Sequence, residues 1–289
     1  MTESKFISLK NNLRNRYQQK RSKPMTICIG AICEERKRAI IISDRMITDE
    51  ELSIEFEHQE SKILPLSNNC VAVTSGSALF FQEILDPIIV KFNGKSSKIS
   101  EIVEEIAKSY SNVRKKKIEE LYFKPMNLTI ENFNQYQTNL NERIIEGLGR
   151  MLEEFEFPGG LEILVIGVDD KAHIYLIDNP GISTLLDSIG WGSIGTGSPH
   201  AEYTFIANKY STKLSFNQAL YLTYQSKRRA EVAPGVGEDT DIYYIDNSGI
   251  HQLSPDSKEK LNNIFTEKEN SIRPIEQKVM NEIAKLSLW

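Results

Sequence analysis

The sequence MTICIGA at residues 25–31 opens a run of short apolar segments, followed by IIISDR at 40–45 and SKILPL at 61–66. Polar residues and turn formers separate the three segments. Short β-branched runs bounded in this way predict three successive strands. We therefore expect a sheet to begin at the first of them.

Three polar residues on these strands form a candidate hydrolytic site. Thr26 supplies a hydroxyl, Asp44 a carboxylate and Lys62 an ammonium. A hydroxyl is a weak nucleophile at neutral pH, and a nearby base and a neighbouring positive charge activate it. Such a set needs no His, no Cys and no metal. It has one condition, because Thr26 assists its own reaction only as the first residue of the chain.

Composition is that of a globular protein. The chain has 289 residues, 40% of them hydrophobic, and a formal net charge of -5 at pH 7. This charge argues against a dedicated nucleic-acid binder, because such proteins usually carry a basic excess. No apolar run approaches the roughly 18 residues of a membrane span, and no signal-peptide core is visible. We expect a cytoplasmic protein that binds neither nucleic acid nor membrane.

Cysteines and histidines give no sign of a disulfide framework or a metal site. The three cysteines lie in or beside predicted strands and are odd in number, so we expect buried free thiols in a reducing compartment. The four histidines show no metal-ligand spacing. We therefore expect no metal and no cofactor. These residues are Cys28, Cys33, Cys70, His58, His173, His200 and His251.

The first 25 residues differ from the rest. Residues 1–24 hold seven Lys or Arg against the single acid Glu3. Apolar residues recur there at near-helical spacing, which predicts a short basic amphipathic helix. Three interpretations stay open: a terminal arm, a removable propeptide, and a transit peptide or an arm that touches a membrane or nucleic acid.

The remaining chain alternates between strand and helix patterns. Their order favours antiparallel sheets between helical layers. Strands are predicted at 25–33, 38–44, 61–66, 69–75, 161–168, 173–178, 191–195, 240–246 and 250–253. Helices are predicted at 77–93, 98–121, 139–155, 199–209 and 216–231, and the tail 255–289 is expected to be polar and then helical.

The chain resembles the proteasome β-type subunits and their bacterial relatives, within the N-terminal-nucleophile (Ntn) hydrolases. The resemblance covers roughly residues 25–122 and 160–253. In the first half it rests on Thr26 at the head of a strand and Asp44 at the end of the next. Lys62 opens the third strand, and Gly76 follows fourteen residues later.

Three segments of the second half carry the resemblance further. Gly195-Thr196-Gly197-Ser198-Pro199 resembles the family's Gly-Ser-Gly-Ser-Pro turn, with Thr196 in place of the supporting Ser. The segment Lys227–Glu231 resembles the one that carries a supporting Asp, here Glu231. Residues 240–245 resemble the strand that follows.

The resemblance implies an α+β fold, a four-layer αββα Ntn-hydrolase sandwich of two antiparallel sheets between helical layers. The domain would span 26–254 with a helical insertion at 123–159, after a leader at 1–25 and before a helical tail at 255–289.

The same resemblance implies a role for each site residue. Thr26 would be the nucleophile and its free α-amine the base, with a reference pKa of about 7.7–8.0. Lys62 would lie beside the hydroxyl, and Asp44 would orient Lys62. The N–H of Gly76 would donate to the oxyanion, a contact worth roughly 3–4 kcal/mol in comparable sites. Thr196 and Glu231 would position the amine from behind. The pocket for the residue before the cut bond would be lined by Ile47, Glu60, Leu64, Thr74 and Ala78.

Departures from the family pattern bear on activity. Two extra residues separate Thr26 from Asp44, and Pro234 stands roughly where a second supporting Ser is expected. Met25 precedes Thr26, whereas self-cleaving precursors usually carry Gly there. Each residue also has a structural explanation, because Thr favours strands, Asp favours turns and an edge Lys is usually solvated. Thr26 would become terminal by autolysis, or by trimming of Met25 if Met25 is the true initiator.

Three functions follow from these observations. The first is a proteasome-like threonine peptidase that cuts a peptide or protein substrate inside a homo-oligomer, a ring or stacked assembly, with an unfolding ATPase as a further partner. The second is a catalytically inactive assembly subunit whose basic arm gates a ring or binds a partner. The third is an amidase acting on a small molecule.

Overall fold

The computed structural model describes residues 25–49, 54–57, 59, 61–136, 138 and 140–286. The expected leader, apart from its last residue Met25, and the expected pocket residue Glu60 lie outside the described residues. Within the described part of the chain, no helix has both the length and the apolar character needed to cross a membrane.

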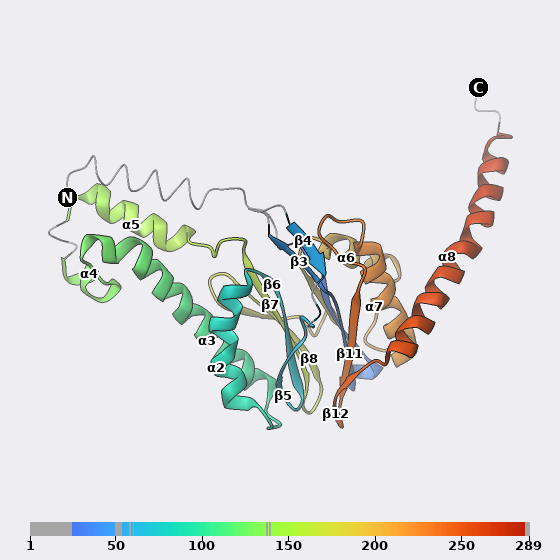
Figure 1. Ribbon diagram of the computed structural model, residues 1–289, viewed down its shortest axis with the longest axis horizontal. Coiled ribbons are helices and arrows are strands. Elements are labelled where there is room, and N and C mark those ends of the chain that lie inside the picture. Colours follow the sequence, from blue (N-terminus) through green and yellow to red (C-terminus); the bar gives the residue numbers. More distant parts are fainter. Residues whose placement is uncertain are drawn as a thin grey trace.

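Two five-stranded sheets form the centre of the molecule (Figure 1). Every pairing in both sheets is antiparallel. The first sheet has the order β10 (Trp191–Ile194), β1 (Cys28–Cys33), β2 (Arg38–Asp44), β11 (Thr240–Asp246) and β12 (Gly249–Gln252). The second has the order β5 (Leu64–Ser67), β6 (Cys70–Gly76), β7 (Leu161–Val168), β8 (Ala172–Asp178) and β9 (Ile182–Leu185). A separate hairpin pairs β3 (Met46–Asp49) with β4 (Ile54–Glu57).

Apolar residues cover both faces of the central strands. On β2, Ile41 belongs to the cluster that the two sheets bury between them. Its neighbours Ile40 and Ile42 point the other way, into a cluster with the helix residue Ala219. Successive side chains of a strand point to opposite faces, so a strand buried on both sides reads as a continuous apolar run. This explains the Ile-Ile-Ile sequence of β2.

Helices pack on the outer face of each sheet (Figure 1). On the second sheet lie α2 (Ala78–Phe92) and α3 (Ile99–Ile118), whose Ile102 and Ile106 share a cluster with Ile163 of β7. On the first sheet lie α6 (Ser198–Ala207) and α7 (Phe216–Ala230). The expected helical insertion contains α4 (Ile130–Tyr136) and α5 (Glu142–Glu154). The described residues also contain three short helical turns: Glu34–Arg36, Glu119–Phe123 and Lys124–Met126.

The last helix, α8 (Pro255–Ile283), extends away from the sheets (Figure 1). Ser254 caps its first turn by accepting a hydrogen bond from the N–H of Ser257, and a proline at the first helical position favours the same start. The tail was expected to be polar first and helical later, but the helix already begins at Pro255. Leu261 is the buried residue of α8, and the Phe265 ring packs 6.0 Å from that of Tyr224.

The structure confirms the mixed α+β class and the antiparallel sheets, and it corrects several details. The sequence patterns missed β3, β4 and β9. All four residues of β9 are exposed, so this edge strand has no apolar alternation to reveal it. The strand expected at 61–66 begins only at Leu64. Lys62 consequently lies in the bend before β5 and does not open the strand.

Candidate active site

Sheet pairing places Thr26 next to Asp44. Thr26 lies two residues before β1, and Asp44 is the last residue of β2. The two strands are antiparallel, with Cys28 opposite Ser43, so the beginning of one meets the end of the other. The N–H of Asp44 extends this ladder by donating to the Ile27 carbonyl at 3.1 Å. The register alone therefore brings the hydroxyl to the carboxylate.

Lys62 completes a close contact of three groups. Its Nζ donates to the Thr26 Oγ1 at 2.5 Å and to the Asp44 Oδ1 at 2.7 Å. The Thr26 hydroxyl donates to the same Asp44 Oδ1 at 2.5 Å. The hydroxyl oxygen thus faces a cation while its proton faces a carboxylate, which is the polarisation that a hydroxyl nucleophile requires. Because Lys62 precedes β5, the site joins the two sheets.

Asp44 is fully buried and accepts four hydrogen bonds. Besides the two donors above, its Oδ1 accepts from the N–H of Ile27 at 3.3 Å. Its Oδ2 accepts from the N–H of Gly237 at 3.0 Å. A buried carboxylate needs such partners to offset the loss of water. The carboxylate is held from two sides, by β1 and by the loop between α7 and β11.

The Gly195–Pro199 turn holds the backbone of Thr26. The N–H of Gly197 donates to the Thr26 carbonyl at 3.2 Å. Gly195 has a φ of 97°, and a Cβ at this position would come within 2.2 Å of the same carbonyl oxygen. Only glycine fits there, since other residues rarely adopt this φ and the space is closed. Thr196 donates its hydroxyl to the Pro234 carbonyl at 3.2 Å.

Glu231 makes its ion pairs with two cations of α7. Its Oε1 lies 2.6 Å from the Lys227 Nζ, and its Oε2 lies 3.0 Å from the Arg228 Nε. The resemblance placed Glu231 behind the α-amine of Thr26. In the structure its carboxylate pairs with these two α7 side chains, and its supporting role behind the Thr26 nitrogen stays a prediction.

Gly76 ends β6 at the same end of the sandwich as Thr26. The Cys28 thiol donates to the Thr74 carbonyl at 3.7 Å, which joins β1 to β6 two residues before Gly76. Gly76 has a φ of 120°, and a Cβ there would come within 2.2 Å of the Gly160 carbonyl oxygen. The backbone at this point therefore requires glycine.

The residues expected to line a substrate pocket are only partly placed. Thr74 is buried beside Cys28. Leu64 is partly buried and packs against the apolar cluster under α2 and α3. Ile47 lies on β3 and Ala78 begins α2, but their side chains fall outside the described part of the structure.

Cys28 is the other nucleophilic group near the site. Its side chain is fully buried, and burial raises the pKa of its thiol to about 12, despite the opposing effect of Lys62. A thiol with this pKa stays protonated at neutral pH and is inert as a nucleophile. All three cysteines are buried and free, as expected.

Lys227 and Gly237 are the functional candidates that the sequence patterns did not reveal as such. Lys227 is fully buried, with its Nζ bonded to Glu231 and to the Glu238 carbonyl. Nothing in a helical pattern distinguishes a buried lysine from a solvated one. Gly237 was expected in a turn, but its contact with Asp44 arises only from the fold.

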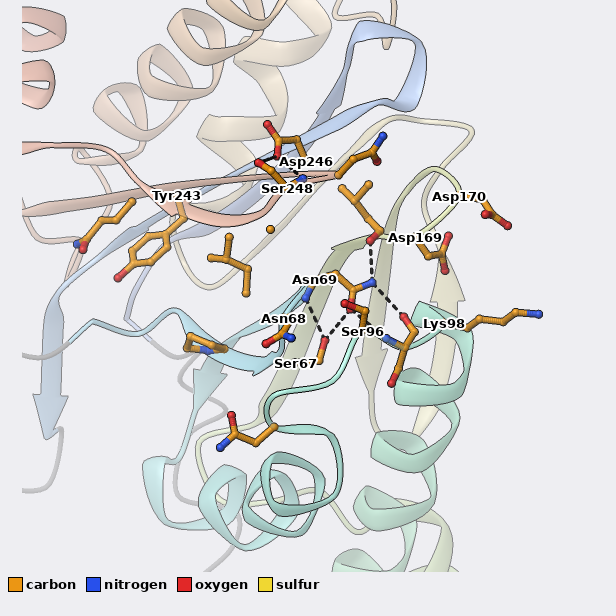
Figure 2. A pocket seen from close by; sticks show the side chains of 18 residues that line it. Ser67, Asn68, Asn69, Ser96, Lys98, Asp169, Asp170, Tyr243, Asp246 and Ser248 are labelled. Atoms are coloured by element: carbon orange, nitrogen blue, oxygen red, sulfur yellow. Dashed lines mark hydrogen bonds between the residues drawn. The ribbon is translucent and has the colours of Figure 1, made fainter.

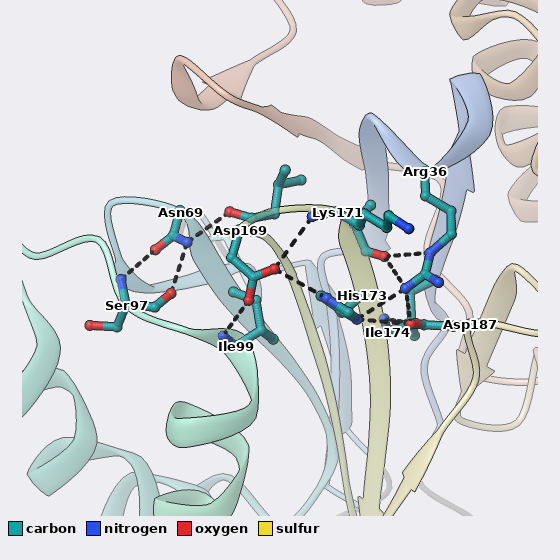
Figure 3. Close-up of polar contacts among 11 residues, drawn as sticks. Arg36, Asn69, Ser97, Ile99, Asp169, Lys171, His173, Ile174 and Asp187 are labelled. Carbon is teal, nitrogen blue, oxygen red and sulfur yellow. Dashed lines mark hydrogen bonds and ion pairs between the residues drawn. The ribbon is translucent and has the colours of Figure 1, made fainter.

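Polar groups away from Thr26 are engaged in structural networks. The His173 ring lies between two carboxylates, with Nδ1 2.8 Å from the Asp187 Oδ2 and Nε2 3.1 Å from the Asp169 Oδ1 (Figure 3). Arg36 also binds Asp187. Across the described residues, no group of three or more His, Cys, Asp or Glu side chains is arranged to hold a metal ion.

An open groove of about 1210 Å³ lies at the other end of the sheets (Figure 2). It is lined mainly by hydroxyl, amide and carboxylate groups, including Ser67, Asn69, Asp169 and Asp246. Asn69 is used within the fold, since its Nδ2 donates to the carbonyls of Ser97 and Val168. The groove borders the β11–β12 turn, whereas Thr26 lies at the opposite end of these strands.

Comparison with known proteins leaves the site to be interpreted from its geometry. No protein-family model matches the sequence, and no curated protein matches it.

Proposed function

We propose that this protein is a threonine-type Ntn hydrolase, a proteasome-like peptidase or amidase. The observation that carries the proposal is the mutual contact of Thr26, Lys62 and Asp44, with all three distances at 2.7 Å or less. Three polar groups at one buried point would be costly without a purpose, because burial of charge needs full pairing. Thr26 is preferred to Cys28 as nucleophile because it alone contacts both Lys62 and Asp44.

In the proposed reaction the Thr26 oxygen attacks the carbonyl carbon of an amide. Lys62 stabilises the developing alkoxide, while the freed α-amine of Thr26 takes the proton, directly or through water. The N–H of Gly76 is proposed to donate to the oxyanion. An acyl-enzyme forms as the amine product leaves, and water then releases the acid.

The fold supports the proposal at a finer level than the α+β class. Apolar clusters occur between the two sheets and on the outer face of each sheet, under α2 and α3 on one side and α6 and α7 on the other. We interpret this stacking as the four-layer αββα sandwich of Ntn hydrolases. Assembly into a homo-oligomer, a peptide or protein substrate and an unfolding ATPase belong to the same proposal.

One observation favours the second candidate, an inactive assembly subunit. With Met25 in place, the nitrogen of Thr26 is an amide without basicity, and Thr26 is only 4% exposed. Met25 fits tightly against Gly235, where a Cβ would come within 2.1 Å of the methionine Cβ. In this form the site is closed, and activity requires removal of residues 1–25.

The deciding experiment is the intact mass and N-terminal sequence of the purified protein, together with labelling by a threonine-directed β-lactone. Wild type is compared with Thr26→Ala, with Thr26→Ser and with the control Thr184→Ala, a threonine on the exposed strand β9. A mature chain beginning at residue 26 and labelled in wild type, the serine variant and the control supports the hydrolase. An unprocessed chain that the β-lactone does not label supports the assembly subunit.

A further inference from the structure

The loop between α7 and β11, residues 231–239, contacts every backbone segment that holds the nucleophile. Its Gly237 N–H donates to the Asp44 Oδ2 at 3.0 Å. Its Pro234 carbonyl accepts a hydrogen bond from the Thr196 hydroxyl. Thr196 belongs to the Gly195–Pro199 turn, which holds the Thr26 carbonyl through the Gly197 N–H. Gly235 of the loop lies against Met25. The loop therefore supplies one of the four hydrogen bonds that hold the Asp44 carboxylate, the one on Oδ2.

A buried lysine fixes the end of this loop. The Lys227 Nζ donates to the Glu238 carbonyl at 2.7 Å and to the Glu231 Oε1 at 2.6 Å. One contact is at the start of the loop and the other is at the residue directly after Gly237. The lysine thus closes the loop upon itself.

The cost of burying this ammonium suggests a role beyond filling space. The Lys227 side chain is fully buried. Burial lowers the pKa of Lys227, and the Glu231 carboxylate opposes that shift. A buried ion pair is often no more stabilising than apolar residues of similar volume. Because α7 packs on β1 and β2, the lysine ties the loop to the strands that position Thr26 and Asp44.

We infer that Lys227 is a positioning residue that aims the Gly237 N–H at Asp44 and so orders the contact among Asp44, Lys62 and Thr26. This inference rests on the proposed hydrolase function. Lys227 touches none of the reacting atoms. It acts by fixing the Glu238 carbonyl in the 238–239 peptide, which restrains the 236–237 peptide two planes earlier, whose Gly237 N–H donates to the carboxylate. Glu231 supports this arrangement by neutralising the lysine.

The test compares Lys227→Met, Lys227→Arg and the matched control Lys258→Met. The Lys258 Nζ also donates to a backbone carbonyl nearby, that of Thr240 at 3.2 Å. Thr240 pairs with Asp44 across β11 and β2, but the sheet itself holds that residue in place, and this lysine does not bind the loop 231–239. For each variant we would measure the pH dependence of labelling by the β-lactone, with unlabelled Thr26→Ala as the blank. Hydrogen exchange of the peptide spanning 231–239 and the thermal midpoint complete the set.

Lys227→Met is expected to lower the labelling rate by about tenfold to a hundredfold, since small misplacements at a site have effects of this order. Its pH–rate profile should also move its acidic limb to higher pH, because removal of a buried cation near the site favours the protonated form of the α-amine that is the proposed base. Exchange in the loop should accelerate. Lys227→Arg should recover part of the rate, and Lys258→Met should match wild type in rate, pH profile and loop exchange.

Two results would overturn the inference and leave the hydrolase proposal intact. In the first, Lys227→Met has the same labelling rate and pH profile as Lys258→Met. In the second, Lys227→Met has a lower thermal midpoint but an unchanged labelling rate, pH profile and loop exchange. Wild type that labels no better than Thr26→Ala would overturn the proposed function and the inference with it. If Lys227→Met does not fold, Glu231→Gln takes its place. It keeps an acceptor for Lys227 but removes the charge that neutralises the lysine, so slower labelling and faster exchange in the loop are expected, and wild-type values for both refute the inference.

Discussion

The Lys62 Nζ lies 2.5 Å from the Thr26 Oγ1, although the two residues precede strands of different sheets and are separated by 35 residues of chain. Replacing Lys62 by Met should therefore lower the rate of β-lactone labelling by about a hundredfold, the scale of a lost proton-transfer or charge partner. Lys62→Met also leaves the buried Asp44 carboxylate without its cation, so we expect a loss of about 3 kcal/mol in the free energy of unfolding, and labelling is measured where the variant is folded. Equal labelling of Lys62→Met and of Lys171→Met, a change in the exposed β7–β8 turn, would show that Lys62 is structural.

Asp44→Asn tests the four hydrogen bonds that meet on this carboxylate. The amide replaces one acceptor oxygen by a donor among groups that already donate, so we expect a loss of about 3 kcal/mol in the free energy of unfolding, as for other broken buried pairs. Labelling of Thr26 should fall below detection. Urea unfolding and labelling measure the two effects.

Asp241→Asn is the control that separates stability from activity for Asp44. Asp241 is also fully buried and binds Arg45 through two hydrogen bonds of 2.9 and 2.6 Å. Its variant should lose comparable stability yet keep its labelling. If both variants lose labelling in proportion to their stability, Asp44 has no special part in the reaction.

Gly195→Ala should damage the site more than its backbone conformation alone explains. Alanine costs about 1–2 kcal/mol at a left-handed φ, and Gly94→Ala should show this cost alone, because a Cβ there meets nothing within 4 Å. At Gly195 the added Cβ also displaces the Thr26 carbonyl. We expect Gly195→Ala to lose about 2 kcal/mol more in the free energy of unfolding than Gly94→Ala. It should also be labelled more slowly by the β-lactone. Equal unfolding curves for the two variants would contradict the close approach.

His173 should make stability depend on pH. The hydrogen bond that His173 donates to Asp187 raises the pKa of His173 above its ordinary 6.5. Both ring nitrogens face carboxylates, and only the imidazolium can donate to both at once (Figure 3). A pKa raised by folding stabilises the protein fully below pH 6.5, and this contribution is lost as the pH rises through the folded value.

His173→Gln is therefore expected to cost about 1.5 kcal/mol at pH 5.5, the order of a hydrogen bond to a charged group. The cost should shrink steadily at higher pH, as measured by urea unfolding across the range. Wild type and His173→Gln both contain the charged neighbours Asp169, Asp187 and Arg36. The difference between their unfolding free energies therefore reports on the histidine alone. A cost that is constant or grows with pH would show that the ring is neutral.

The sequence by itself determined the elements with strong apolar patterns and the order in which they occur. The Ile-Ile-Ile run of β2 and the inner stripe of α3 are local signals, because a strand or helix that buries a face must repeat apolar residues along it. The sequence also supplied Thr26, Asp44 and Lys62 as chemical types. It failed at β3 and β4, which have only four residues each, and at β9, whose four residues are all exposed, because such segments give no clear apolar alternation.

Which groups meet depends on the three-dimensional fold. The register of β1 on β2 brings Thr26 to Asp44, and the packing of the second sheet brings Lys62 to both. The burial of Lys227 and the contact of Gly237 with Asp44 have no local signal, since each depends on segments far apart in the chain. A hydrogen bond forms between atoms close in space, and sequence spacing constrains that distance only within one helix or strand.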